Sequence, residues 1–380
     1  IRDNTILPPS VLVGELLDTL DRGFYSAGGE PVSAQQVTRH PLQAFSWRYF
    51  SGDARLFSYA QELVEAGRQA GRGKQVPAAL LTAALPEPEP ALHNVTLEDL
   101  IRFFKNPARW LLRERLGIRP EEGQEALATR EPFVLNGLEN YQVLEQMLEL
   151  HLDRRPAAEI ATILRAEGAL PHGQVGKCVF TQAQERVARF AGRLGRVWPR
   201  RAQEPLVMDV PLGGFRLTGQ MSGLTPDGWV GYRLAGMKAN DYLNLWLHHL
   251  ALNVATPDGM TPQSHWVAED REVLLEPVEE AAAHLQALLE IYWQGTQRLL
   301  HFFPKSALVY SDTLRQDKNQ DADKALRAAR RAWEGSDYGY NRAERDDAYY
   351  QLAFRETDPL DAEFVELALA VFAPLFTQVK

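Results

Sequence analysis

Cysteine is almost absent from this sequence, which holds one in 380 residues, Cys178. A single cysteine excludes an internal disulfide and any zinc or iron–sulfur site built on several thiolates, and it favours a reducing, cytoplasmic setting. Long apolar runs are also missing, because the longest, from Leu367 to Phe376, is too short to span a bilayer. The start has neither an initiator Met nor a targeting pattern, so we expect a piece of a longer chain without membrane contact.

Positive charge is scarce as well. The chain has 50 acidic and 41 basic residues, which gives a net charge of −9. This balance excludes a protein that coats nucleic acid with its whole surface, so any contact with DNA must be local. Neither a nucleotide-binding glycine pattern nor a recognisable set of metal ligands is present, and we expect no cofactor and no metal.

What the sequence does contain is helical patterning around one short stretch that alternates like strands. The alternating stretch runs from Pro205 to Ala235 and predicts a small central sheet. A Pro-Glu repeat that follows Leu85 predicts a boundary between residues 1–85 and 86–380. Apolar residues at helical spacing predict helices at 10–20, 59–68, 136–152, 181–197, 239–254, 278–302, 322–333 and 362–376.

A capping pattern marks another helix. Thr96 and Asp99 have the spacing of a capping box, in which the side chain at the first position accepts a hydrogen bond from the backbone of the fourth. Apolar residues from Leu97 onward then recur on one side. Pro107 lies inside this pattern and is expected to kink or restart the helix, because proline cannot donate the backbone hydrogen bond.

The stretch "LTGQMSGLTPDGWVGYRL", from Leu217 to Leu234, has the layout of a metal-binding hairpin in a magnesium-dependent nuclease. Such a site places one acid on the first strand and an acid-x-Lys on the next, because magnesium prefers carboxylate and water ligands. Here Ser222 stands at the first acid position, and Gly231 and Arg233 stand at the ends of the acid-x-Lys. The carboxylates that magnesium needs are therefore missing.

Six segments that follow one another along the chain carry a resemblance to a known family. They are "DNTILPPSVLVGELLD", "HPLQAFSWRYF", "TLEDLIRFFKNPARWLLRERLGI", "EPFVLNGLENYQ", "LTGQMSGLTPDG" and "LNLWLHHLAL". In this order they resemble the C-terminal part of the RecC family, the gamma chains of exodeoxyribonuclease V, over essentially the whole chain. The order makes the match far more specific than any single motif.

The resemblance implies an α/β fold of the degenerate restriction-endonuclease-like type, with a small mixed central sheet and extensive flanking helices. It also implies that residues 1–85 are the tail of an inactive helicase-like domain, and that residues 86–380 are a nuclease-like domain without catalysis. Related nucleases carry a cluster-binding cysteine before the proline of the "FFKNPARWLL" segment, whereas this chain has Asn106. With one cysteine, a four-thiolate cluster cannot form.

The resemblance further implies a role inside a helicase–nuclease. Its partners would be a RecB-like and a RecD-like subunit, double-stranded DNA ends and the unwound single strands. The chain would scaffold the complex and guide strands during double-strand break processing and recombinational repair, without cutting DNA itself.

Two groups of basic residues are candidates for contact with DNA phosphate. The first is a stripe at spacings of three and four, which would share one helix face: Arg186, Arg189, Arg193, Arg196 and Arg200. The second follows the capped helix: Arg102, Lys105 and Arg109. Both groups also fit a solvated helix face, and the stripe equally fits a protein partner.

Two rival readings stay open at this point. An active magnesium nuclease would have to use unconventional ligands such as Asp209, Asp227 or Asp241, although Asp227 is already explained by its Pro-Asp-Gly turn. A pure subunit-docking scaffold would make no contact with DNA. The neighbouring residues His248 and His249 lack the His-Glu-x-x-His pattern of a catalytic zinc site.

Overall fold

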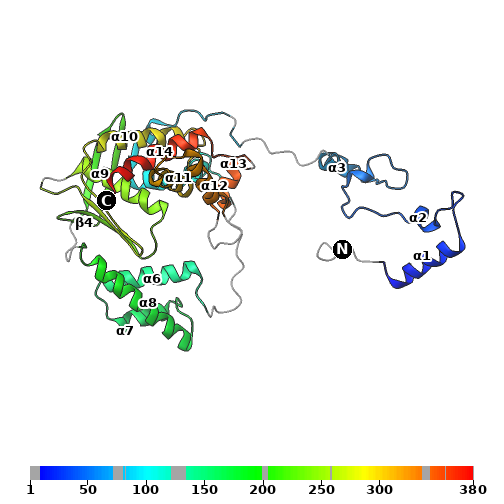
Figure 1. Ribbon diagram of the computed structural model, residues 1–380, viewed down its shortest axis with the longest axis horizontal. Coiled ribbons are helices and arrows are strands. Elements are labelled where there is room, and N and C mark those ends of the chain that lie inside the picture. Colours follow the sequence, from blue (N-terminus) through cyan, green and yellow to red (C-terminus); the bar gives the residue numbers. More distant parts are fainter. Residues whose placement is uncertain are drawn as a thin grey trace. The chain divides into compact units, whose positions relative to one another are not determined.

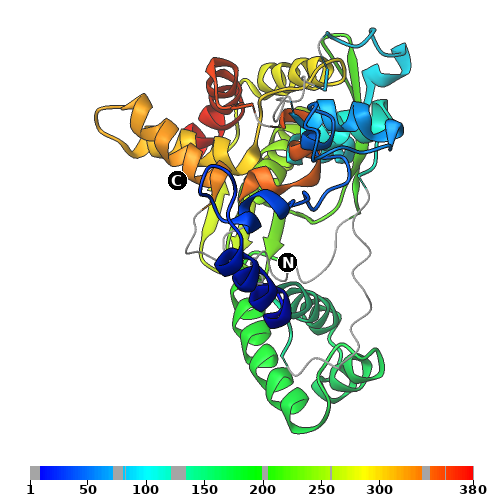
Figure 2. The ribbon, with the colours of Figure 1, turned by 90° about the vertical axis from the view of Figure 1, so that its right-hand side faces the viewer.

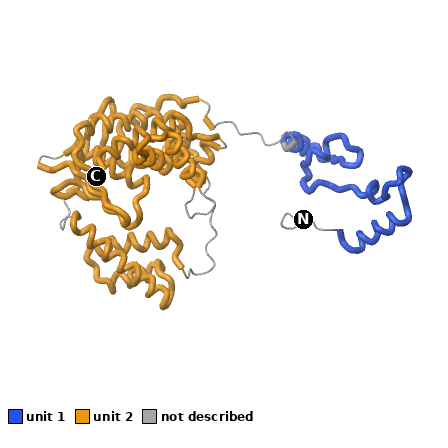
Figure 3. Tube along the Cα trace, in the orientation of Figure 1, with its two compact units in different colours: residues 1–77 blue, residues 78–380 orange. Residues whose placement is uncertain are grey.

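The structure is a computed structural model that describes residues 9–71, 80–81, 83–120, 134–198, 204–256, 259–335, 343–355 and 357–379. The chain folds into two compact units, residues 1–77 and residues 78–380 (Figure 3). The Pro-Glu segment after Leu85 is held against the second unit, because Leu85 donates to the carbonyl of Gln297 at 2.7 Å and Arg115 donates to the carbonyl of Pro86 at 2.9 Å. The assignment of residues 1–85 to a helicase-like domain stays a prediction.

The first unit consists of short helices with few buried side chains. The helix predicted at 10–20 is present and extends to Gly23, and it leaves Leu12 and Leu16 exposed. Leu56 is the buried large apolar side chain in the described part of this unit. Its elements are α1 Val11–Gly23, α2 Val32–Gln36, η1 Trp47–Tyr49, η2 Gln61–Leu63 and α3 Val64–Gly71.

The second unit holds most of the secondary structure. The predictions at 136–152, 239–254, 322–333 and 362–376 are confirmed to within two residues at each end. Its helices are η3 Pro90–His93, α4 Leu97–Lys105, α5 Pro107–Trp110, η4 Leu111–Arg115, α6 Gly137–Leu152, α7 Ala157–Ala166, α8 Gly173–Leu194, α9 Ala239–Ala255, α10 Ala281–Gly295, α11 Pro304–Gln316, α12 Ala322–Glu334, η5 Glu344–Asp346, α13 Ala348–Phe354 and α14 Ala362–Gln378.

The side-chain N-cap predicted at the start of α4 is confirmed. The hydroxyl of Thr96 accepts from the backbone of Asp99 at 3.0 Å and donates to its carboxylate at 2.8 Å. The helix stops at Lys105 and restarts at Pro107, as the missing proline N–H requires. Between the two helices Asn106 is buried and its side-chain oxygen accepts from the backbone of Arg109 at 2.8 Å. Asn106 therefore serves as the N-cap of α5.

The sequence predicts one small central sheet, whereas the structure has two mixed sheets. The first has the order β1-β3-β2 and the second the order β4-β5-β6-β7, and each combines parallel and antiparallel pairs. The strands are β1 Asn94–Thr96, β2 Leu206–Leu212, β3 Phe215–Met221, β4 Leu224–Thr225, β5 Gly228–Arg233, β6 Ser264–Ala268 and β7 Glu272–Leu275.

The predicted hairpin turn at Pro226 and Asp227 is confirmed, because it joins the antiparallel strands β4 and β5 through the pair Thr225–Gly228. Strand β3, however, pairs with β2 and β1 in the other sheet, so the hairpin does not run from β3 to β5. Gly228 has a φ of 128°, and a Cβ there would lie 2.1 Å from the carbonyl oxygen of Gln263. Only glycine allows this close approach of β5 to the chain before β6.

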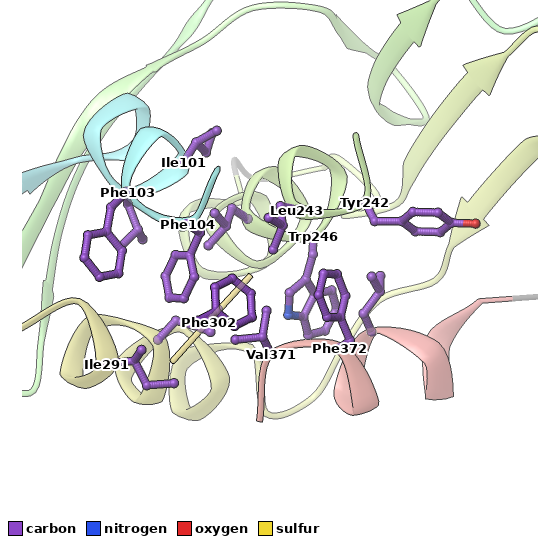
Figure 4. Close-up of a cluster of buried hydrophobic side chains, with 14 of the residues drawn as sticks. Ile101, Phe103, Phe104, Tyr242, Leu243, Trp246, Ile291, Phe302, Val371 and Phe372 are labelled. Atoms are coloured by element: carbon purple, nitrogen blue, oxygen red, sulfur yellow. The ribbon is translucent and has the colours of Figure 1, made fainter. Parts of the chain in front are cut away.

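The main core of the second unit surrounds α9. This helix leads from β5 to the parallel strand β6, which is the crossover that a parallel pair needs. Figure 4 shows Trp246 of α9 among Phe104 of α4, Phe302 and Phe372 of α14. All four side chains are less than 2% exposed, so the core fixes the position of α9 beside the sheet.

Helices α6, α7 and α8 gather in a lobe that lies to one side of the rest of the second unit (Figures 1 and 2). The lobe has its own buried cluster, which includes Leu144, Leu164 and Phe190. That cluster continues to Val230 of β5 and Val267 of β6, so the lobe covers the face of the second sheet opposite α9. Among the described residues, no helix has both the length and the apolar character to cross a membrane.

Candidate functional site

The first degenerate position, Ser222, lies directly after β3 and its side chain is exposed. Its carbonyl oxygen accepts a hydrogen bond at 2.9 Å from the indole nitrogen of Trp229 in β5. Backbone and indole therefore join the two strands at the position where the resemblance predicts the first carboxylate of a nuclease, and the serine hydroxyl supplies no ligand charge for a metal.

The second degenerate position, Gly231, has no room for a side chain. A Cβ on Gly231 would lie 2.5 Å from the ring of Trp229 and 2.6 Å from the ring of Trp266. Trp229 also stacks on His248 of α9, with ring centroids 4.4 Å apart and planes at 12°. The two buried indoles thus fill the space into which a side chain at position 231 would point, and the imidazole of His248 packs against one of them.

The third degenerate position, Arg233, is engaged in a partly buried ion pair. Its guanidinium donates to Asp241 at 2.7 Å, and the same carboxylate oxygen accepts from the backbone of Lys238 at 2.7 Å as part of the start of α9. Desolvation opposes the charge, but the hydrogen bond and the charge of Asp241 outweigh it and raise the pKa of Arg233. The guanidinium also lies over the ring of Tyr141 in α6, 5.3 Å from its centroid.

These contacts give Arg233 a structural role. It connects β5 to the start of α9 on one side and to the α6–α8 lobe on the other. Because Asp241 is bound by both Arg233 and the backbone of Lys238, its charge is already compensated. A divalent ion would have to displace the arginine to bind there.

The other carboxylates proposed for an unconventional site are also accounted for. Asp209 of β2 accepts two hydrogen bonds at 2.6 Å from Arg216 on the neighbouring strand. Asp227 lies in the turn between β4 and β5, where its backbone donates to Thr225 at 3.1 Å. Within the described residues, no three His, Cys, Asp or Glu side chains form a group that could hold a metal ion.

The predicted arginine stripe does not form one free face. Helix α8 ends at Leu194, so Arg196 follows it in a turn, and Arg200 lies outside the described residues. Arg186 binds the carboxylate of Glu269 with two hydrogen bonds. Arg193 donates to the carbonyls of Ala268 and Glu269 at 3.0 and 2.8 Å, and to a further carboxylate at 3.1 Å, that of Glu272. Both arginines attach α8 to the turn between β6 and β7.

Arg189 and Arg196 differ from those two, because both are exposed. Among the described residues neither forms an ion pair within 4.0 Å. Spacing alone predicted equal roles for all members of the stripe. The structure instead separates the arginines that hold α8 to the sheet from those whose charge faces solvent.

The second group of basic residues divides in a similar way. Arg102 pairs with Glu98 at 3.0 Å and Asp99 at 2.8 Å within α4, and Arg109 donates to Asp347 at 2.8 Å and lies over the ring of Tyr349. Lys105 is the nearest of the three to the degenerate site. Desolvation lowers its pKa, and the negative charge of Asp241 opposes this shift.

Two histidines of α9 complete the surroundings of the site. His249 is fully buried, and its ring contacts the hydroxyl of Ser264 at 2.9 Å and the carbonyl of Glu276 at 3.0 Å. Burial lowers the pKa of His249 to about 4, and that of His248 likewise to about 4. Both rings are therefore neutral near pH 7, and His249 is a buried structural residue out of reach of a substrate.

Together these features define a helix-rich, mixed α/β protein in which the nuclease-type positions hold serine, glycine and a paired arginine. The family model of the RecC C-terminal domain matches residues 92–315, and the chain belongs to the RecC family.

Curated relatives agree with this assignment. The chain is 30% identical to the RecBCD enzyme subunit RecC of Escherichia coli (strain K12) over 99% of its own length and 34% of that protein. Identity to the subunit of the same name from Haemophilus influenzae is 24%, over 100% of this chain and 33% of the relative. The RecBCD enzyme subunit RecC of Mycolicibacterium smegmatis is 30% identical, over 66% of this chain and 23% of the relative. The chain thus spans about a third of the length of the first two relatives.

Proposed function

We propose that this chain is a non-catalytic module of a RecC subunit, which scaffolds a helicase–nuclease and guides DNA strands during double-strand break processing and recombinational repair. The observation that carries the proposal is the packing around Gly231, where the rings of Trp229 and Trp266 occupy the space of a metal-binding carboxylate. Without that carboxylate, magnesium lacks the oxygen ligands it needs to activate water.

We further propose that the second unit is a degenerate restriction-endonuclease-like domain. Support comes from the order of its central elements, in which β3 leads through Ser222 to β4 and β5, and α9 then crosses to the parallel strand β6. The degenerate positions fall at the end of β3 and along β5, where the resemblance expects the acid and the acid-x-Lys.

The partners follow from the same family. The relatives are named as subunits of the RecBCD enzyme. We therefore infer that this chain works in the cytoplasm beside a RecB-like and a RecD-like subunit, on double-stranded DNA ends and unwound single strands. The single cysteine suits that reducing compartment.

For contact with DNA phosphate we favour Lys105 and Arg196 among the predicted residues. Arg102, Arg109, Arg186 and Arg193 already bind carboxylates of this chain. Arg196 is exposed and without an ion pair among the described residues, and Lys105 lies near the degenerate site, where a nuclease would hold the phosphate backbone. Arg189 borders a groove of the α6–α8 lobe.

This assignment predicts a specific change in salt dependence. Binding of a forked DNA is measured by fluorescence anisotropy across salt concentrations, for the chain and for the double variant Lys105→Ala, Arg196→Ala. Because each lost phosphate contact reduces the slope of log K against log salt by roughly 0.9, the double variant should lose about 1 to 2 units of slope.

The matched control is Lys177→Ala, which removes an exposed cation from α8 and should leave the slope unchanged. If the double variant keeps the original slope while the chain binds DNA, Lys105 and Arg196 are not its phosphate contacts. If the chain shows no salt-dependent binding at all, it is a scaffold without its own contact to DNA.

A further inference from the structure

The α6–α8 lobe carries a groove of about 550 Å³ between α6 and α8. Apolar side chains form its floor: Val134, Leu135, Leu144, Val175, Val179 and Ala183. Two of them are left largely in water, since Val134 is 80% and Val175 40% exposed. Leu138, in the first turn of α6, is 66% exposed as well. Apolar side chains gathered in this way mark a surface that another molecule covers.

The two ends of the groove differ, because its wall along α8 is apolar at one end and positively charged at the other. Val175, Val179 and Ala183 line the first half, and Arg186 and Arg189 line the second. At 1.5 Å per residue, Val179 and Arg189 lie about 15 Å apart along the helix axis. An elongated occupant that follows α8 therefore meets apolar surface first and guanidinium groups afterwards.

The charge available to an occupant comes from Arg189. Glu269 is already bound by two nitrogens of Arg186, and Arg189 has no ion pair within 4.0 Å among the residues that the structure describes. Glu185 also borders the groove. A helix turns about 100° per residue, so Glu185 points about 40° farther than Arg189 from the stripe formed by Val175, Val179 and Ala183. A polar group above the groove therefore meets Arg189 before it meets Glu185.

We propose that this groove is a docking site for an amphipathic helix of a partner protein, whose apolar face covers Val175 and Val179 and whose carboxylate pairs with Arg189. Helices bind such grooves through apolar anchors three and four residues apart, and one charged residue at the end of the stripe fixes their direction. The inference rests on the scaffolding part of the proposed function and adds the surface that performs it.

The test uses the whole RecC-family protein, assembled in cells with its partner subunits. A photo-crosslinking phenylalanine derivative replaces Val175, and a control replaces Thr162, which is exposed on α7 and does not line the groove. We expect a crosslink from position 175 to one peptide of a partner subunit that has an apolar helical stripe and an Asp or Glu about four turns from the crosslinked residue, because Val175 and Arg189 lie about 21 Å apart along α8. Position 162 should give no such product.

Charge reversal tests the orientation. Arg189→Glu should lower the crosslink yield at position 175 about tenfold, and exchanging the mapped carboxylate for lysine should restore it. Lys177→Glu reverses an exposed charge on the opposite side of α8 and should have no effect. Crosslinks only to DNA, only within this chain, or at equal yield from both positions would each overturn the proposal. None of these results bears on whether the chain cleaves DNA. The docking proposal and the proposed absence of catalysis can therefore be disproved independently.

Discussion

Replacing Gly231 by aspartate lowers the free energy of unfolding by about 3 to 5 kcal/mol and does not restore a nuclease. The new Cβ would lie within 2.6 Å of the rings of Trp229 and Trp266, so one or both indoles must move out of a close-packed core. The carboxylate would then be buried against the apolar rings of Trp229 and Trp266. Urea denaturation followed by tryptophan fluorescence measures the loss.

The matched control is Ser222→Asp, the other vacant acid position. Ser222 is exposed, and its backbone carbonyl rather than its side chain holds Trp229, so aspartate should change stability by less than about 0.5 kcal/mol. If Gly231→Asp were as stable as the parent, the indoles would not fill the acid position as described. The proposal that the packing around Gly231 excludes a metal-binding carboxylate would then be wrong.

Acidification from pH 7 to pH 4 removes about 3 kcal/mol of stability through His249 alone. Burial lowers the pKa of His249 in the folded protein to about 4, whereas the unfolded chain has the ordinary value of 6.5. Between these values the unfolded state binds more protons than the folded state, so stability is full above pH 6.5 and is lost as the pH falls to about 4. Urea midpoints measured at intervals across this window follow the loss.

His249→Gln separates this effect from general acid denaturation. Glutamine retains polar groups toward Ser264 and Glu276 but does not titrate, so the variant should be less stable at pH 7 and lose about 3 kcal/mol less between pH 7 and pH 4. His151→Gln, at an exposed position on α6, should leave the pH dependence unchanged. An identical pH dependence for His249→Gln and the parent would show that His249 is not the buried neutral group.

Local signals in the sequence were sufficient for the long helices and for several of their ends. The N-cap at Thr96, the restart at Pro107 and the turn at Pro226–Asp227 follow from backbone chemistry that a few neighbouring residues determine. The lobe helix α7 and the helix α11 were missed, and so were the strands β1, β6 and β7. The strands are three to five residues long, too short for a local pattern to distinguish them, and the parallel partners of β1 and β6 are distant in sequence.

The division into two sheets could not be predicted for a related reason. The stretch from Pro205 to Ala235 alternates throughout, but β3 pairs with β1, more than a hundred residues earlier, while β5 pairs with β6 after α9. Strand pairing over such distances depends on packing of the whole chain. The helix predicted at 278–302 is also shorter in the structure, where α10 runs from Ala281 to Gly295. A Cβ on Gly295 would lie 2.3 Å from Phe103, a tertiary contact that the local sequence does not reveal.

The candidate site shows the same limit. Sequence spacing predicted that Ser222, Gly231 and Arg233 are degenerate positions, and that remains a prediction. It could not show that Trp229 and Trp266 fill the vacancy, or that Asp241 neutralises Arg233, because Trp266 lies beyond the hairpin and both contacts are tertiary. It also treated the arginine stripe as uniform, since the pairing of Arg186 and Arg193 with the β6–β7 turn depends on where α8 packs.

The central expectation for this chain is that it does not cleave DNA with magnesium, and one assay measures this directly. End-labelled single-stranded and double-stranded DNA is incubated with the purified chain and Mg²⁺, beside the variants Asp209→Asn, Asp227→Asn and Asp241→Asn. We predict no cleavage by the chain above the level of any variant, because no described group of carboxylates is placed to hold the metal. Magnesium-dependent cleavage that disappears in one of these variants would contradict the account and identify an unconventional nuclease site.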